Sequence, residues 1–337
     1  MAPVIVGPNQ PKRFYRGGSR IHAFRGEGVA DGWRPEDWVG STTTLFGETA
    51  MGLTALPDGT LLRDAIRADP RPWLGPAHVG RHGDNPALLV KLLDAGQRLP
   101  IHVHPTRDFA KRHLRSPYGK AEAWVILEAS NDAAIFLGFV EDIDRPTIET
   151  WVRRQDTSSM LRSMNRIPVR AGDGVFVPAG TPHTLSDGIF LLEAQEPTDF
   201  SVLLEWQDFA IDGEAFGHLG LGLDIALDAV DLSGWSMERL RGALVRLGAP
   251  VRSGLTTALP ASASAFFQID RLEPQPTVEI EPGFGVLVIT AGTGRISGKA
   301  FDDFEVTQGM SVLVPYGAGR LRMSGDVKGL ISRPSLT

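Results

Sequence analysis

Short apolar runs that end at glycine or proline recur along the chain, and this punctuation is what most limits the folds it can adopt. The 38 glycines and 24 prolines divide the sequence into segments such as VFVPAG, FLLEAQ, VLVITAG and VLVPYG. Each run is long enough for a strand and short for a helix. Regularly spaced short strands of this kind predict a mainly β fold, a barrel or a sandwich.

Four stretches depart from this pattern and predict helices. Apolar residues recur at three- and four-residue spacing over residues 60–68, 86–95 and 237–247, and we expect these helices to flank the sheets. Residues 107–114 are rich in charge and lie between two expected strands. This fourth stretch therefore predicts a helix inserted into the β fold.

One motif occurs twice with the same spacing, which predicts two related units. The stretch from Gly172 to His183 reads GDGVFVPAGTPH, and the stretch from Gly309 to Arg320 reads GMSVLVPYGAGR. Only the first copy ends in a histidine. We therefore expect a first domain over residues 1–211, a helical connection over 212–255, and a second domain over 256–337.

Composition excludes several classes of protein. The 34 basic and 40 acidic side chains give a net charge of −6 without a stripe of lysine and arginine, so we expect no nucleic-acid partner. The chain has no apolar run of about 18 residues and no secretory pattern at its start, so we expect no membrane span and a cytoplasmic location. The absence of cysteine excludes thiolate metal sites. A metal would need histidines and carboxylates, and no oligomeric state is indicated.

Histidines and one carboxylate form the strongest chemical signal. In QRLPIHVHP, an extended backbone places His102 and His104 on one face. In the next expected strand, KAEAWVIL, the same alternation puts Lys120, Glu122 and Trp124 on a common face.

A third histidine, His183, follows the turn sequence PAGTP, where proline and glycine set the direction of the side chain. Three imidazoles and one carboxylate suit zinc, manganese, iron or cobalt. They also leave coordination positions open, as in a catalytic site.

These motifs resemble those of a known family. Gly96 lies six residues before His102, Glu122 follows later, and the stretch from Gly172 to His183 completes the two cupin motifs. More narrowly, LVKLLDAGQRLPIHVHP, GKAEAW, VPAGTPHTL and LLEAQEPTD resemble the class I mannose-6-phosphate isomerase family, as does GLTALPDGTLLRDAIRADPRPWLG upstream. The resemblance covers most of residues 10–206. It implies two cupin-type, jelly-roll-like β-barrels with inserted and connecting helices, of which the first binds metal and is catalytic and the second is metal-free.

The resemblance also implies roles for individual residues. The family's metal ligands fall on His104, Glu122 and His183, and its fourth ligand, usually a glutamine, falls on His102. The expected cofactor is one divalent metal, zinc in the first place, with manganese, iron or cobalt as alternatives. Lys120 matches a lysine that the family keeps beside the metal.

Two departures fall where the family is expected to hold its substrate. Pro100 stands at the position of a serine, and Leu203 stands at the position of an active-site arginine. A hydroxyl and a guanidinium are therefore missing. Candidates to replace the guanidinium are Arg98, Arg16 and Arg20.

The function implied by the resemblance is metal-dependent isomerisation of mannose 6-phosphate to fructose 6-phosphate. Lys120 and Glu193 would be catalytic, and Arg98, Trp124 and Gln195 would bind the sugar or sugar phosphate. One alternative is an isomerase of the same family that acts on a non-phosphorylated or modified sugar. A non-catalytic cupin that binds sugar and metal is a second alternative, and an iron-dependent dioxygenase is a third.

Overall fold

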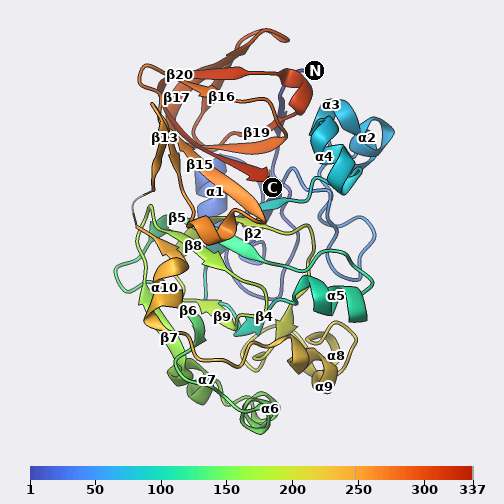
Figure 1. The fold of residues 1–337 in the computed structure, drawn as a ribbon, viewed down its shortest axis with the longest axis vertical. Coiled ribbons are helices and arrows are strands. Elements are labelled where there is room, and N and C mark those ends of the chain that lie inside the picture. The colour runs from blue at the N-terminus through green and yellow to red at the C-terminus, as the bar shows by residue number, and fades with distance from the viewer. Residues whose placement is uncertain (247, 336–337) are drawn as a thin grey trace.

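The computed structural model describes residues 1–246 and 248–335, and these form three antiparallel sheets stacked along the long axis of the molecule (Figure 1). The middle sheet has six strands, in the order β12 (Leu244–Val245), β8 (Gly174–Val177), β5 (Glu122–Ala129), β10 (Ile189–Gln195), β3 (Leu89–Ala95) and β2 (Glu36–Val39). A five-stranded sheet has the order β11 (Val202–Leu203), β4 (His102–Val103), β9 (His183–Leu185), β6 (Ala134–Phe139) and β7 (Met164–Pro168).

The third sheet has nine strands and contains both ends of the described chain. Its main path is β1 (Val4–Val6), β19 (Ser311–Val314), β17 (Gly285–Gly298), β20 (Leu321–Pro334), β15 (Phe267–Leu272), β14 (Leu255–Thr257) and β13 (Pro250–Arg252). Two further strands pair beside this path, β16 (Thr277–Ile280) with β20 and β18 (Phe304–Thr307) with β17. The first strand of the chain thus joins the C-terminal sheet, while the domain limits themselves stay a prediction.

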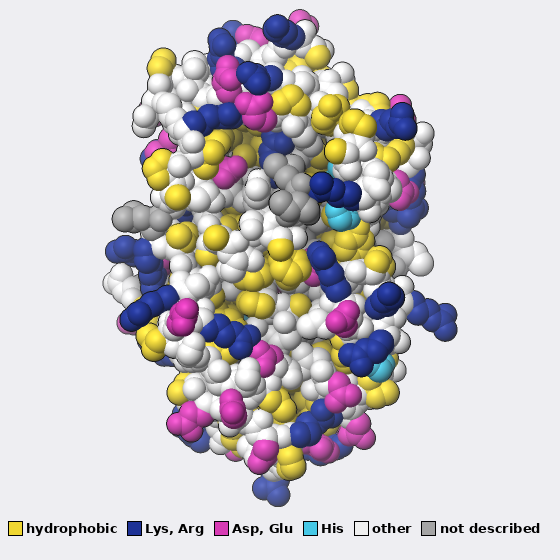
Figure 2. Space-filling view, viewed as in Figure 1, with side chains coloured by type: hydrophobic (Ala, Val, Ile, Leu, Met, Phe, Trp, Pro, Cys, Tyr) yellow, Lys and Arg dark blue, Asp and Glu magenta, His cyan; other side chains and the backbone are white. Residues whose placement is uncertain are grey.

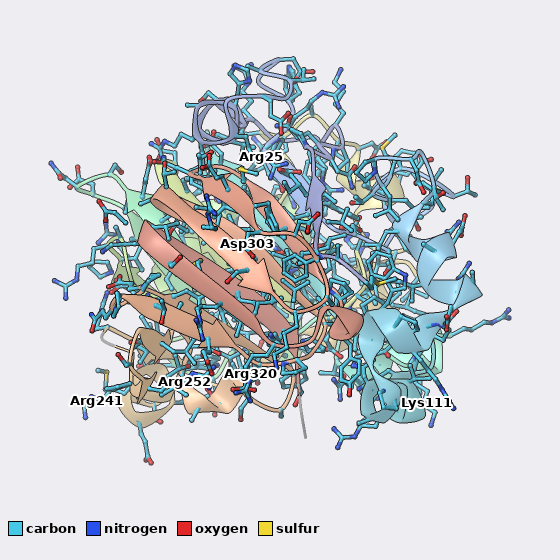
Figure 3. All side chains as sticks on the ribbon, turned by 90° about the horizontal axis from the view of Figure 1, so that it is seen from above. Arg25, Lys111, Arg241, Arg252, Asp303 and Arg320 are labelled. Atoms are coloured by element: carbon cyan, nitrogen blue, oxygen red, sulfur yellow. The ribbon has the colours of Figure 1, made fainter. Side chains whose placement is uncertain are left out.

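Buried arginine and aspartate side chains hold this N-terminal segment in place. The Arg25 guanidinium donates to the carbonyl of Val6 over 3.0 Å and lies 3.4 Å from Asp37 Oδ2 (Figure 3). It also contacts the hydroxyl of Ser311 on β19. One buried cation, Arg25, therefore connects β2 of the middle sheet with β1 and β19 of the nine-stranded sheet.

Two hydrophobic layers explain why the middle sheet is buried on both faces. Trp124, Ile126 and Leu191 pack against Ile135 and Leu137 of the five-stranded sheet. The opposite face packs against the nine-stranded sheet, through residues that include Val90, Val125, Leu192, Ile269 and Val288. Burial of this much apolar surface is the main stabilisation of the arrangement.

Short helices flank the sheets and fill the connections. Those in the first half are α1 (Ser19–Arg25), α2 (Leu62–Ala68), α3 (Pro70–Leu74), α4 (Pro76–His82) and α5 (Arg107–His113). Further along are α6 (Arg145–Arg154), α7 (Thr157–Ser163), α8 (Gly213–Phe216), α9 (Leu223–Ala226) and α10 (Met237–Gly242), with 3₁₀ turns η1 (Leu227–Ala229), η2 (Ala261–Ala263) and η3 (Tyr316–Ala318). Ile148, Val152 and Met160 of α6 and α7 pack on the outer face of the five-stranded sheet. Within the described residues, no helix has both the length and the apolar character to cross a membrane.

The mainly β, jelly-roll-like fold with inserted helices is confirmed. The sheets face each other as open sandwiches, and in the described part of the chain the strand pairing does not close into a ring. Hydrophobic packing between the middle and five-stranded sheets forms the first unit. In the C-terminal part, strands of the single nine-stranded sheet enclose their own core, which includes Leu287, Ile296 and Met323.

The expected helix over residues 86–95 is wrong, because this segment contains strand β3 (Leu89–Ala95), buried at every position. A strand covered on both faces is apolar throughout, so its residues also match helical spacing. The helices expected at 60–68 and 107–114 are confirmed as α2 and α5. Of the stretch 237–247, α10 covers only the first part. Strand β12 follows it, and residue 247 lies outside the described residues.

The first part of the repeated motif, the glycine and the strand after it, adopts the same backbone in both units, whereas, in the described chain, a 3₁₀ turn, η3, follows only in the second copy. Gly172 and Gly309 have φ angles of 89° and 88°, which favour glycine, and each precedes a buried four-residue strand, β8 or β19. Arg320, which ends the second copy, lies at the surface and pairs with Glu279 and Glu281 (Figure 3).

Charges of both signs are interspersed over the face of the molecule shown in Figure 2.

Candidate active site

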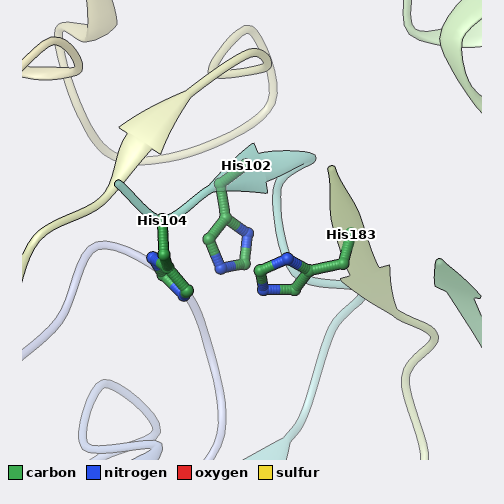
Figure 4. Close-up of side chains that lie close together, drawn as sticks. All are labelled: His102, His104 and His183. Atoms are coloured by element: carbon green, nitrogen blue, oxygen red, sulfur yellow. The ribbon is translucent and has the colours of Figure 1, made fainter. Parts of the chain in front are cut away.

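Three histidines come together where the five-stranded sheet faces the middle sheet (Figure 4). His102 on β4 and His183 on β9 are direct partners across the strand pair, and His104 follows β4. One side-chain nitrogen from each lies within 4.8 Å of the other two, and all three side chains are buried. The expected convergence of the histidines is thus present.

Backbone carbonyls orient all three rings. The Nδ1 atoms of His102, His104 and His183 lie 2.8, 2.7 and 2.8 Å from the carbonyl oxygens of Pro100, Phe200 and Thr181. A carbonyl can only accept, so each Nδ1 carries a hydrogen, and the lone pair remains on Nε2. This is the tautomer that presents Nε2 to a metal.

Glu122 completes the group of acceptors. Its Oε2 lies 3.0 Å from His104 Nε2, and its Oε1 lies 3.2 Å from His183 Nε2. Despite these approaches, Glu122 Oε2 and His183 Nε2 have no partner with hydrogen-bond geometry among the described residues. The Lys120 ammonium meets His104 Nε2, with its Nζ at 2.7 Å. The two unpartnered acceptors, Glu122 Oε2 and His183 Nε2, still lack a positive group of suitable geometry within the described chain, so this donor set fits a divalent metal.

The electrostatic environment favours the metal-binding protonation states. Burial lowers the pKa of His104 to about 3, helped by the positive charge of Lys120, and burial also holds the pKa of His102 well below its usual value. Burial alone would raise the pKa of Glu122, but Lys120 at 3.1 Å and the neighbouring histidines hold it well below its ordinary value. The His102 and His104 imidazoles are therefore neutral and the Glu122 carboxylate is charged near neutral pH.

Lys120 and Glu193, the two expected catalytic residues, line the same pocket as this cluster. The empty space of the pocket is about 540 Å³, a figure that includes the part open to solvent. Burial raises the pKa of Glu193, although Lys91 opposes the shift. Trp124 also lines the pocket, and its Nε1 has no hydrogen-bond partner among the described residues.

A network of buried charges forms the deeper wall of the pocket, and sequence reasoning missed it. Lys91 Nζ lies 3.3 Å from Glu36 Oε2 and 3.3 Å from Glu193 Oε1. Arg13 Nε lies 3.1 Å from Glu36 Oε1, and Arg13 Nη1 lies 3.4 Å from Asp199 Oδ2. The carboxylates overcome the effect of burial and hold the pKa of Lys91 above its ordinary value. The sequence signal for this network was Lys91 itself, because a lysine within the mainly apolar run ALLVKLLDA needs a buried partner for its charge.

Two of the expected substrate-binding residues lie outside the pocket lining. Arg98 Nη1 donates to Glu205 Oε2 over 2.7 Å, and Gln195 Nε2 donates to the carbonyls of Glu196 and Thr198. Their binding roles stay predictions.

The other two arginine candidates also have partners elsewhere. The Arg16 guanidinium lies 5.2 Å from the Trp33 ring, and Arg20 Nε lies 4.0 Å from Asp94 Oδ1. The arginine that lines the pocket is Arg13.

The facing sheets, with the histidines on paired strands and the adjacent glutamate, give the chain a cupin-type fold. No family model matches the chain. Its sequence is 29% identical to mannose-6-phosphate isomerase ManA of Bacillus subtilis over 254 residues, which are 74% of this chain and 76% of that protein. It is 26% identical to the mannose-6-phosphate isomerase of Streptococcus mutans over 243 residues, 72% of each chain.

Solved structures extend the similarity to the whole chain. The crystal structure of mannose 6-phosphate isomerase from Bacillus subtilis superposes with a TM-score of 0.78 and 20% identity, covering 99% of this chain and 100% of that one. A putative mannosephosphate isomerase from Archaeoglobus fulgidus gives a TM-score of 0.75 at 15% identity, covering 100% and 99%. The chain is thus similar to mannose-6-phosphate isomerases in sequence and in fold, as its motifs indicated.

Proposed function

We propose that this protein is a metal-dependent aldose–ketose isomerase, which interconverts a mannose-type aldose and a fructose-type ketose. The observation that carries the proposal is the grouping of three buried histidines and Glu122 with Lys120 and Glu193 beside one pocket. Its similarity to mannose-6-phosphate isomerases supports the same reaction class. A cytoplasmic location stays a prediction.

The residues that would hold the metal are His102, His104, Glu122 and His183. When bound, a divalent ion supplies Lewis-acid polarisation of the sugar oxygens. Nitrogen and carboxylate ligands with open positions make zinc the expected ion, with manganese, iron or cobalt as alternatives.

The side chains around this cluster have the properties that isomerisation requires. The reaction moves a proton between adjacent carbons, so it needs a base near the substrate and a positive group near the oxygen that gains charge. Glu193 is suited to the first task, because burial raises its pKa toward neutrality and its Oε1 can take and return the proton. The Lys120 ammonium is suited to the second, and Trp124 Nε1 can donate a hydrogen bond to a sugar hydroxyl.

Glu122→Gln and His104→Ala test this proposal against a control on the same strand, Glu128→Gln, whose side chain is exposed. Metal content and isomerase activity would be measured on both mannose 6-phosphate and free mannose. We expect the two site variants to lose bound metal and at least about 100-fold in kcat/KM, and Glu128→Gln to retain both. Folded site variants with full isomerase activity would refute the proposed function.

A further inference from the structure

The positive side chains that line the pocket in the described structure are all compensated by carboxylates. They are Arg13, Lys91 and Lys120, and the lining contains four carboxylates, Glu36, Glu122, Glu193 and Asp199. Each cation lies within 3.4 Å of at least one of these carboxylates.

Two basic side chains near the metal cluster in sequence, Arg98 and Arg107, are also paired. Arg98 forms two contacts with Glu205, and Arg107 Nε lies 2.6 Å from Glu196 Oε1. A phosphate group placed here would have to take a guanidinium or ammonium from a buried carboxylate. That exchange leaves a buried charge unpaired, which is costly.

Two buried atoms in the lining need groups that a phosphate dianion does not provide together. Trp124 Nε1 is a donor with no hydrogen-bond partner in the described part of the chain. Glu193 Oε1 is an acceptor that lies 3.3 Å from Lys91 Nζ but receives no hydrogen bond of good geometry from the described residues. A hydroxyl group can donate and accept, so a polyol satisfies both atoms. A phosphate dianion only accepts, and it would repel the Glu193 carboxylate.

The wall beside the histidines is apolar. Leu99, Leu185, Leu203 and Pro100 line the pocket, and Leu203 pairs with His102 across strands β11 and β4. Carbon–hydrogen faces of a sugar can pack on such a wall, whereas a charged ester would lose its hydration there.

From this charge balance we propose that the substrate of this pocket is an uncharged aldose without a phosphate group. The inference rests on the proposed isomerase function and specifies its substrate class.

Binding of two ligands that cannot isomerise tests the inference apart from catalysis. Calorimetric titration of the metal-loaded protein with D-mannitol and with mannitol 1-phosphate compares a neutral polyol with its phosphate ester. We expect mannitol to bind at least about tenfold more tightly. Equal affinities, or tighter binding of the ester, would overturn the inference. Binding of mannitol without turnover of any aldose would instead refute the isomerase function and leave the preference for an uncharged ligand standing.

A substitution that removes part of the charge compensation of one cation tests the physical reason. Asp199→Asn removes one of the two carboxylates that face Arg13 and leaves Glu36, while the amide oxygen can still accept from the backbone N–H of Phe46. We expect the ratio of the ester's affinity to that of mannitol to rise at least fivefold. Asp224→Asn, in an exposed pair with Arg153, is the control and leaves this ratio unchanged. An unchanged ratio in Asp199→Asn would refute the explanation by charge compensation.

Discussion

Replacing Lys91 by methionine should destabilise the protein strongly, because Lys91 is the shared cation of two buried carboxylates. Its side chain is 3% exposed, and its Nζ lies 3.3 Å from both Glu36 and Glu193. At an effective dielectric constant of about 20, each contact is worth about 5 kcal/mol before desolvation. Removing one partner of such a buried pair costs about 3–5 kcal/mol, and we expect that loss for Lys91→Met.

The loss in free energy of unfolding caused by Lys91→Met should increase with pH. Glu36 keeps Arg13 and hydrogen bonds from Tyr15 and Trp38, so the carboxylate that loses most is Glu193. Burial already raises the pKa of Glu193, and the variant raises it further. A carboxyl group whose folded pKa is raised favours folding below its unfolded pKa, and this contribution disappears as pH rises through the folded value. Lys91→Met should therefore be less destabilising at pH 5 than at pH 8.

Urea unfolding of the metal-loaded proteins at both pH values measures these effects, provided that the slope of the transition is unchanged. Lys328→Met, which breaks an exposed pair with Glu273, is the matched control and should cost less than about 1 kcal/mol. The double variant Lys91→Met with Glu193→Gln should recover at least about 1 kcal/mol, because no charge is left at position 193. A cost below about 1 kcal/mol for Lys91→Met, or no recovery in the double variant, would refute the argument.

Three further predictions concern the metal and the sugar. His102→Gln should still bind metal and keep an isomerase kcat/KM within about tenfold of wild type, because an amide oxygen can replace the imidazole as a ligand. His102→Ala should lose metal. Elemental analysis of both variants and their kinetics measure these effects. Trp124→Phe should raise KM by about 5- to 20-fold through loss of the indole donor, with little change in the urea midpoint, and an unchanged KM would contradict that role. Chelation should abolish activity while the far-ultraviolet circular dichroism stays constant, because His102 and His183 lie on paired strands within a packed core. Global unfolding on chelation would show that this reasoning is wrong.

Two parts of the histidine cluster could be predicted from neighbouring residues. His102 with His104, and Glu122 with Lys120, are two positions apart at the starts of β4 and β5, and the alternation of an extended backbone predicts a common side for each pair. His183 comes from a distant strand, and its match to a family motif was the signal that placed it in the cluster.

The alternation rule failed for Arg98. This residue lies in irregular backbone between β3 and β4, where alternation does not continue, and its side chain pairs with Glu205.

The deeper wall of the pocket could not be predicted in this way. Arg13, Glu36, Lys91 and Asp199 are distant in sequence, and their meeting depends on how the N-terminal segment packs against strand β3. The strand itself was mistaken for a helix, because a second sheet covers the face that would otherwise have shown polar residues.

The sequence by itself determined the mainly β character, the repeated glycine–proline turn and the donor set of three histidines and one glutamate. These depend on residue type and on neighbours a few positions away, which set turns and strand faces directly. Only the tertiary structure decided which cations face the pocket and that carboxylates neutralise them. Ion pairing between distant segments is chosen by packing and desolvation, and these act only once the sheets have come together.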